Sequence, residues 1–184
     1  MVCHFELMKK LPLVLFPLIL LMPVKALGQY IRWTANRRLS WADYTGPAEH
    51  NQYAARTNLY VNYTYHWHFS FHIFAYTFNV NNRFNKATSW SLKNKQTPAL
   101  LKHEQLHFDI SELYARRLYI ALNEKTYSAD YKMETAQIFS RIIGALNAAQ
   151  DKYDTETQHF FSTKKQREWE ADIARQLRET PPYP

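Results

Sequence analysis

The sequence predicts an α+β domain in which an N-terminal antiparallel sheet precedes one long helix and two further C-terminal helices. Residues 30–95 are dense in the aromatic and β-branched side chains that favour strands. Residues 99–123 contain neither Gly nor Pro and are rich in good helix formers. Residues 131–178 repeat apolar side chains at helical spacing.

The first 28 residues read as a secretory signal peptide. Lys9 and Lys10 lead the apolar run Leu11–Val24, and the small residues Ala26 and Gly28 follow it. The run is interrupted by prolines and is shorter than the roughly 20 apolar residues of a membrane span. We expect cleavage near Gly28 and a secreted or periplasmic protein without stable membrane insertion; an uncleaved anchor is the alternative.

The remaining chain is expected to form a single domain over residues 29–180, with a disordered tail at 181–184. Its only cysteine, Cys3, lies in the signal segment, which excludes disulfides and Cys-ligated zinc from the mature domain. The formal charge of +7 is distributed in pairs such as Arg37–Arg38 and Lys164–Lys165, without a basic block. This pattern argues against a nucleic-acid partner, and it leaves the oligomeric state open.

The β-rich region centres on Thr57–Val80. Apolar and polar side chains alternate there, but the phase of the alternation changes after Ile73. Such a change requires a bulge, a new buried face, or two separate strands. Shorter features are also predicted: apolar segments at Tyr30–Trp33 and Leu39–Tyr44, a turn at Asn81–Asn82, and a last strand at Ser89–Leu92.

Three histidines, His66, His68 and His72, share one side of this β-rich run. Alternate strand residues share a face, so a second metal site is geometrically possible. No carboxylate accompanies them, and we favour a polar, solvent-facing or cleft-facing strand side.

The long helix begins after Thr97, a good N-cap, with Pro98 at the favoured first position. It carries His103-Glu104-Gln105-Leu106-His107, the pattern His-Glu-x-x-His. Residues four apart lie on one helix face, so both imidazoles can reach one zinc ion at about 2.0–2.1 Å. Glu104 lies beside the ion's open side, as in zincin-like hydrolases. The alternative is a pair of hydrogen-bonded histidines on a half-buried helix.

Catalytic zinc normally has a third protein ligand, which must come from downstream. Residue type alone leaves five candidates: Glu124, Glu134, Asp154, Glu156 and His159. The segment Tyr153–His159 gathers polar groups where a helix should end, ahead of a final helix at Lys164–Arg178. We favour His159 as the metal ligand, with Glu156 as the alternative.

Several stretches resemble a family of bacterial secreted proteins of unknown function that are described as predicted zinc-dependent proteases. They are Leu39–Tyr44, Leu101–Ile110 and Tyr153–His159, with Trp169 at a similar spacing. The resemblance implies the same metal-site residues and supplies no substrate. The family usually has Gly after the final His, where this chain has Phe160.

These observations predict a secreted zinc-dependent peptidase acting on a peptide or protein. Glu104 is expected to be the general base that acts on a zinc-activated water, and Tyr153 or a strand histidine to stabilise the oxyanion. The alternatives are a secreted zinc-binding or interaction module without turnover, a metal-free adhesion domain, and a zinc amidase acting on cell-wall peptides.

Overall fold

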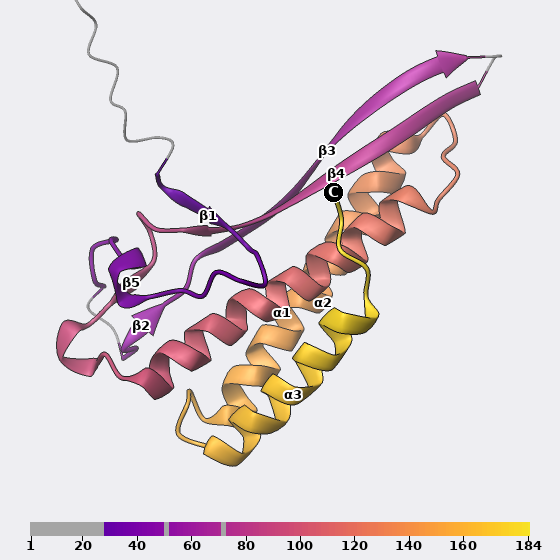
Figure 1. Ribbon diagram of the computed structural model, residues 1–184. Coiled ribbons are helices and arrows are strands. Elements are labelled where there is room, and N and C mark those ends of the chain that lie inside the picture. Colours follow the sequence, from indigo (N-terminus) through magenta and orange to yellow (C-terminus); the bar gives the residue numbers. More distant parts are fainter. Residues whose placement is uncertain (1–27, 50–51, 71–72) are drawn as a thin grey trace, which may run out of the picture.

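The computed structural model describes residues 28–49, 52–70 and 73–184, which form an α+β arrangement with a small antiparallel sheet and three helices (Figure 1). The larger sheet has the strand order β1-β4-β3, and β2 pairs with β5 in a separate ladder. Along the described chain the elements are, in order, β1 (Tyr30–Arg32), the 3-10 turn η2 (Trp41–Asp43), β2 (Ala55–Arg56), β3 (Leu59–Ser70), β4 (Ile73–Asn85), β5 (Trp90–Ser91), the 3-10 turn η3 (Lys93–Lys95), α1 (Pro98–Asn123), α2 (Tyr131–Thr157) and α3 (Thr163–Glu179). Across the described ranges, no helix has both the length and the apolar character needed to cross a membrane.

The alternating run predicted at Thr57–Val80 is two strands, β3 and β4, paired antiparallel. The phase of the pattern changes because the chain reverses direction, and the pairing sets Tyr63 opposite Val80 on one face. The turn predicted at Asn81–Asn82 is wrong, since β4 continues to Asn85. Asn82 is fully buried within the strand, where helix α1 supplies partners for its side-chain amide.

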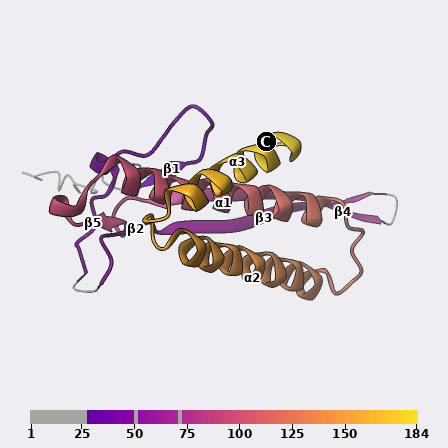
Figure 2. The same ribbon diagram turned by 90° about the horizontal axis from the view of Figure 1, so that it is seen from below.

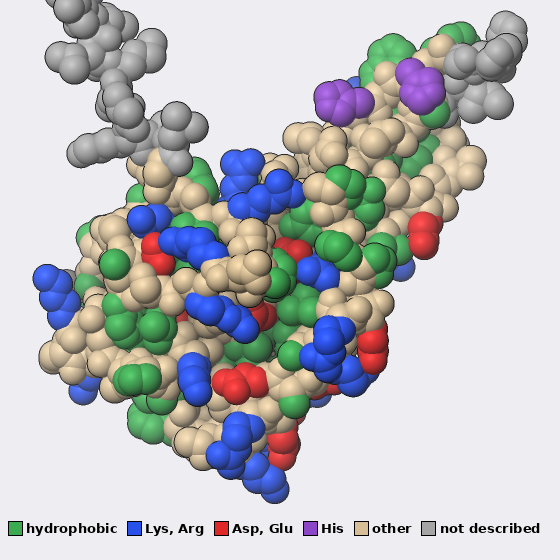
Figure 3. Space-filling model, in the orientation of Figure 1, with side chains coloured by type: hydrophobic (Ala, Val, Ile, Leu, Met, Phe, Trp, Pro, Cys, Tyr) green, Lys and Arg blue, Asp and Glu red, His purple; other side chains and the backbone are tan. Residues whose placement is uncertain are grey.

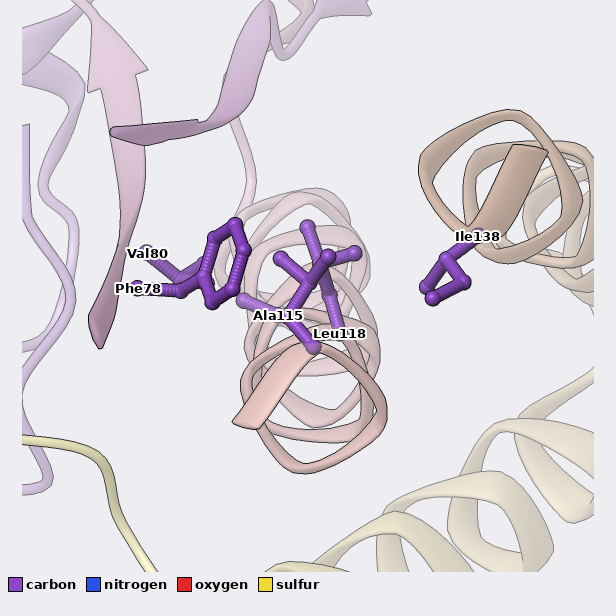
Figure 4. Close-up of a cluster of buried hydrophobic side chains, with 6 residues drawn as sticks. Phe78, Val80, Ala115, Leu118 and Ile138 are labelled. Atoms are coloured by element: carbon purple, nitrogen blue, oxygen red, sulfur yellow. The ribbon is translucent and has the colours of Figure 1, made fainter. Parts of the chain in front are cut away.

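Helix α1 is the centre of the molecule, with the sheet on one side and α2 and α3 on the other (Figures 1 and 2). The predicted start is confirmed: the Thr97 hydroxyl accepts a hydrogen bond from the Leu100 amide at 3.1 Å. On the sheet side, Phe78 packs with Ala115 and Leu118 of α1, and Ile138 of α2 reaches the same core (Figure 4). Burying a side chain of this size stabilises the fold by about 1.5–3 kcal/mol.

The C-terminal helices cover the other side of α1. Leu106, Ile110 and Leu113 pack there against Leu146 of α2 and Ile173 of α3. The helical prediction for residues 131–178 is confirmed, with a break after Thr157 that separates the two helices. This packing fixes the last turn of α2 against the first turns of α1.

Three remaining expectations concern the ends of the chain and the strand histidines. The C-terminal tail does not fray as expected but lies on the core, where the Tyr183 hydroxyl donates to Glu112 at 3.1 Å. His66 and His68 are exposed on β3, in agreement with a solvent-facing strand side. His72 and residues 1–27, nearly all of the predicted signal peptide 1–28, lie outside the described residues, so the signal peptide stays a prediction.

Candidate metal centre

The two motif histidines lie one turn apart on the side of α1 that faces α2. His103 is buried, with 3 % of its surface exposed, and His107 is partly buried. Their Nε2 atoms are 3.2 Å apart, and the rings are nearly perpendicular at 89° with centroids 4.7 Å apart. Both rings therefore direct the same nitrogen to one point.

Asp154, in the last turn of α2, supplies a third atom at that point. Its Oδ1 lies 3.0 Å from Nε2 of His103 and 3.0 Å from Nε2 of His107. Within the described part of the chain, these three residues form the one cluster of at least three His, Cys, Asp or Glu with ligand atoms close enough to hold a metal ion. Two ligands at 2.0–2.1 Å from a tetrahedral ion are about 3.3 Å apart, so a small widening of this triangle fits zinc.

Two glutamines fix which nitrogen of each ring faces the centre. Gln150 Oε1 lies 2.6 Å from Nδ1 of His107, and its Nε2 donates to the His107 carbonyl at 2.9 Å. Gln166 Oε1 lies 3.4 Å from Nδ1 of His103, and its Nε2 donates to Glu170 at 3.0 Å. Because each amide nitrogen has another acceptor, each amide oxygen faces an imidazole and requires a proton on Nδ1. In the neutral rings both Nε2 atoms then carry lone pairs.

The two Nε2 atoms and Asp154 Oδ1 are therefore all hydrogen-bond acceptors when the imidazoles are neutral. A donor appears among them only when one imidazole takes a second proton. Burial lowers the pKa of His107, but the hydrogen bond to Asp154 and the charges of Glu104 and Asp154 outweigh burial and raise the pKa overall. Burial raises the pKa of Asp154, while hydrogen bonds to His103 and His107 lower it well below its usual range. A positive charge is favoured here, whether it comes from a proton or from a metal ion.

Glu104 stands beside the centre and is held by a directed chain of hydroxyls. Thr57, just after β2, donates to Glu104 Oε2 at 2.5 Å, and the Tyr44 hydroxyl lies 2.8 Å from Thr57 Oγ1. Since the Thr57 proton is committed to Glu104, the Tyr44 hydroxyl is the donor of the second bond. The other oxygen of Glu104, Oε1, accepts no hydrogen bond from a described residue and is left for a water or substrate.

Tyr153 packs against the ring of His103 on the core side of the candidate metal centre. It is fully buried, and its ring stacks on His103 with centroids 4.5 Å apart. Its hydroxyl lies 2.7 Å from Gln166 Oε1 and 3.2 Å from the His103 carbonyl, so it points into the core. Burial raises the pKa of this phenol well above its usual range, and the charges of Glu104 and Asp154 add to this. These contacts are those of a group that holds the His103 ring in place, and the oxyanion role predicted for Tyr153 stays a prediction.

The structure places the predicted third ligands as follows. His159 lies beside the centre, with Nδ1 3.9 Å from Asp154 Oδ1 and 57 % of its side chain exposed, so its role as a ligand stays a prediction. Glu156 points away and accepts from Trp169 Nε1 at 2.9 Å. Glu124 caps the C-terminus of α1 and Glu134 lies in the first turn of α2. Both are at the helix ends away from His103 and Asp154.

The turn that carries His159 has an uncommon backbone. Gln158, His159 and Phe160 all have positive φ, at 52°, 51° and 79°. Non-glycine residues pay about 1–2 kcal/mol for a left-handed conformation. Glycine at position 160 would have no such cost.

Sequence reasoning placed Asp154 among five candidates without favouring it, and it missed Gln150, Gln166 and Thr57. A signal was present for α2, since residues 150, 153, 154 and 157 follow the spacing of one helix face. Helix α2 continues through Thr157, so these four residues share one face. Gln150 and Asp154 on that face contact the histidines of α1. Thr57 offered no comparable signal, because its contact with α1 depends on how two distant segments pack.

A model of the bacterial protein family of unknown function DUF922 matches residues 33–160 of this chain. The matched range includes all of α1 and α2 and therefore the three candidate ligands His103, His107 and Asp154. No curated protein and no solved structure matches the chain.

Proposed function

The chain belongs to this bacterial family of unknown function, DUF922, and we propose that it is a secreted, zincin-like zinc-dependent peptidase. Its metal ligands would be His103, His107 and Asp154. The observation that carries the proposal is the convergence of their three acceptor atoms at 3.0–3.2 Å, with each imidazole tautomer set by a glutamine. Two imidazoles and one carboxylate are a donor set typical of catalytic zinc.

Zinc bound there would supply Lewis acidity and lower the pKa of a bound water to about 7. The free Oε1 of Glu104 would accept the proton of the attacking water and deliver it to the leaving amine. Thr57 holds Oε2 and so fixes the direction of Oε1. His159 is exposed beside the ligands and is available as a further ligand or as an oxyanion donor. Tyr153 keeps the ring of His103 in place.

The test is Glu104→Gln in the chain beginning at residue 29, with Glu124→Gln, at the C-cap of the same helix, as the matched control. We expect Glu104→Gln to bind one zinc per chain and to lose about 10²–10⁴-fold in peptide hydrolysis, because general-base catalysis contributes that factor. The control should behave as the parent. Undiminished hydrolysis by Glu104→Gln would remove the catalytic assignment.

A peptide-library digest with and without chelator distinguishes the other functions. A zinc-binding module without turnover would bind the ion and cleave nothing, with Glu104→Gln silent. A cell-wall amidase would leave the library intact and release peptide from peptidoglycan. Absence of zinc binding would leave only a metal-free interaction domain.

A further inference from the structure

A concave region lies apart from the candidate metal centre, between α1, α3 and the loop at residues 33–39. Its volume is about 750 Å³, and none of the three ligands, Glu104 or Tyr153 lines it. The hollow lies on the face drawn in Figure 3, where both basic and acidic side chains surround an apolar floor. A pocket of this size falls in the range of small-molecule sites, about 300–1,000 Å³.

The floor of this groove is apolar. Its apolar lining comes from all three segments and includes Leu39, Leu101, Leu106, Ile173, Ala174 and Leu177. Such a surface gains free energy when an apolar chain displaces water from it.

The buried charges in the groove are already neutralised. Asp109 accepts from Arg38 at 2.7 Å and from the Trp33 indole at 2.7 Å. Arg116 donates to Glu112 at 3.0 Å. These groups shape the floor but leave no net charge to recognise a ligand.

Three charged residues of the lining remain: Lys102, Arg178 and Glu170. Neither Lys102 nor Arg178 has an ion pair with a described residue, and Glu170 accepts only from Gln166. Helix α3 runs alongside α1, with Gln166 near His103 and the Leu177 carbonyl on Arg116. Lys102 and Glu170 therefore lie toward one end of the groove and carry opposite charges. Arg178 lies at the other end, and the one other carboxylate of the lining, Asp109, is already paired with Arg38.

We propose that this groove binds a single-chain fatty carboxylate. Its tail lies over the apolar floor between α1 and α3, and its carboxylate meets Arg178. The charge of the rim selects against the chain's own apolar segment Leu11–Val24, which is led by Lys9 and Lys10. A basic peptide would meet Arg178 with repulsion, whereas an anionic head group is complementary to it.

The probe is dodecanoate, titrated below its micelle concentration into the chain beginning at residue 29, with dodecanol as the uncharged comparison. Saturable binding of one dodecanoate is expected, tightening by up to about fourfold per added methylene until the groove is filled. Arg178→Gln should weaken dodecanoate by about two- to fivefold and leave dodecanol unchanged. Ala174→Trp should block both ligands by filling the groove. Arg141→Gln on α2 is the matched control and should change neither.

Chelator should leave dodecanoate binding intact, which separates this proposal from the peptidase proposal. Three outcomes would overturn it. One is the absence of saturable binding, and another is dodecanoate affinity that Arg178→Gln and Ala174→Trp leave unchanged. The third is failure of dodecanoate to bind either the full chain 1–184 or a dimer of the shorter chain. In those cases the groove would be occupied by residues 1–28 or by a second copy of the chain.

Discussion

Helix α1 carries two buried polar clusters, and they are built on opposite principles. In the metal centre, His103, His107 and Asp154 direct three acceptor atoms at one point. In the second cluster, which we call the Glu112 network, Glu112 Oε1 accepts from Arg116 and its Oε2 accepts from Asn82 and Tyr183, while Ser111 donates to Asn82. The first cluster brings together acceptor atoms alone, whereas the second pairs its carboxylate and amide acceptors with donors.

The difference separates a network whose donors and acceptors satisfy one another from a cluster whose acceptors can hold an ion. A closed network joins β4, α1 and the C-terminal tail, and no added ligand improves it. An open cluster of buried acceptors costs stability unless an ion or a proton compensates it.

The largest effect expected is that of Glu112→Ala. The Arg116 guanidinium would be left buried without its carboxylate, which costs about 3–5 kcal/mol in the free energy of unfolding. Zinc stoichiometry should not change, because the network and the metal centre share no ligand. Urea denaturation and zinc titration of the same sample check this; loss of zinc with intact stability would contradict the separation of the two clusters.

Gln150→Leu tests the support of the metal centre. The Nδ1 proton of His107 loses its acceptor, and zinc affinity should fall by about 10–100-fold, as for other outer partners of metal-bound histidine. Gln137→Leu, exposed on the same helix, is the control. Equal zinc affinities for the two variants would show that Gln150 does not set the tautomer.

The pH dependence of the metal centre should have opposite signs in its two states. The raised pKa of His107 gives the metal-free protein stability that is complete below the unfolded value of about 6.5 and is lost as pH rises through the folded pKa. Zinc competes with that proton, so zinc affinity should increase over the same window. Thermal melts and zinc titrations from pH 5.5 to about 8.5 measure both slopes, and His107→Gln should flatten them.

Phe160→Gly should produce the smallest effect. Glycine relieves the left-handed strain of about 1–2 kcal/mol but adds about 0.5–1 kcal/mol of unfolded-state entropy. A net stabilisation of about 1 kcal/mol or less is expected, with zinc affinity unchanged. Destabilisation by more than about 1 kcal/mol would mean that the phenyl ring packs in an essential way.

Local rules were enough to predict the helices from the sequence. Thr97 and Pro98 define the start of α1, and the i, i+4 spacing places His103 and His107 on one face. The alternation also predicted strands, although only the pairing of β3 with β4 decided among three explanations of the phase change at Ile73.

Tertiary packing supplied what the sequence could not. Asp154 reaches the histidines because α2 ends against the first turns of α1, which is a matter of interhelical register. Asn82 looked like a turn residue because Asn favours turns. It lies in a strand because Ser111 and Glu112 provide buried partners that a sequence pattern does not reveal.

The most direct test of the central claim is calorimetric zinc titration of Asp154→Asn beside Asp151→Asn, an exposed position on the same helix. We expect one zinc per chain for the parent and for Asp151→Asn. Asp154→Asn should bind zinc at least about 100-fold more weakly, because losing a direct ligand should cost no less than losing a group that only supports a ligand. Equal affinities for the two variants would contradict the assignment of Asp154 as the third ligand.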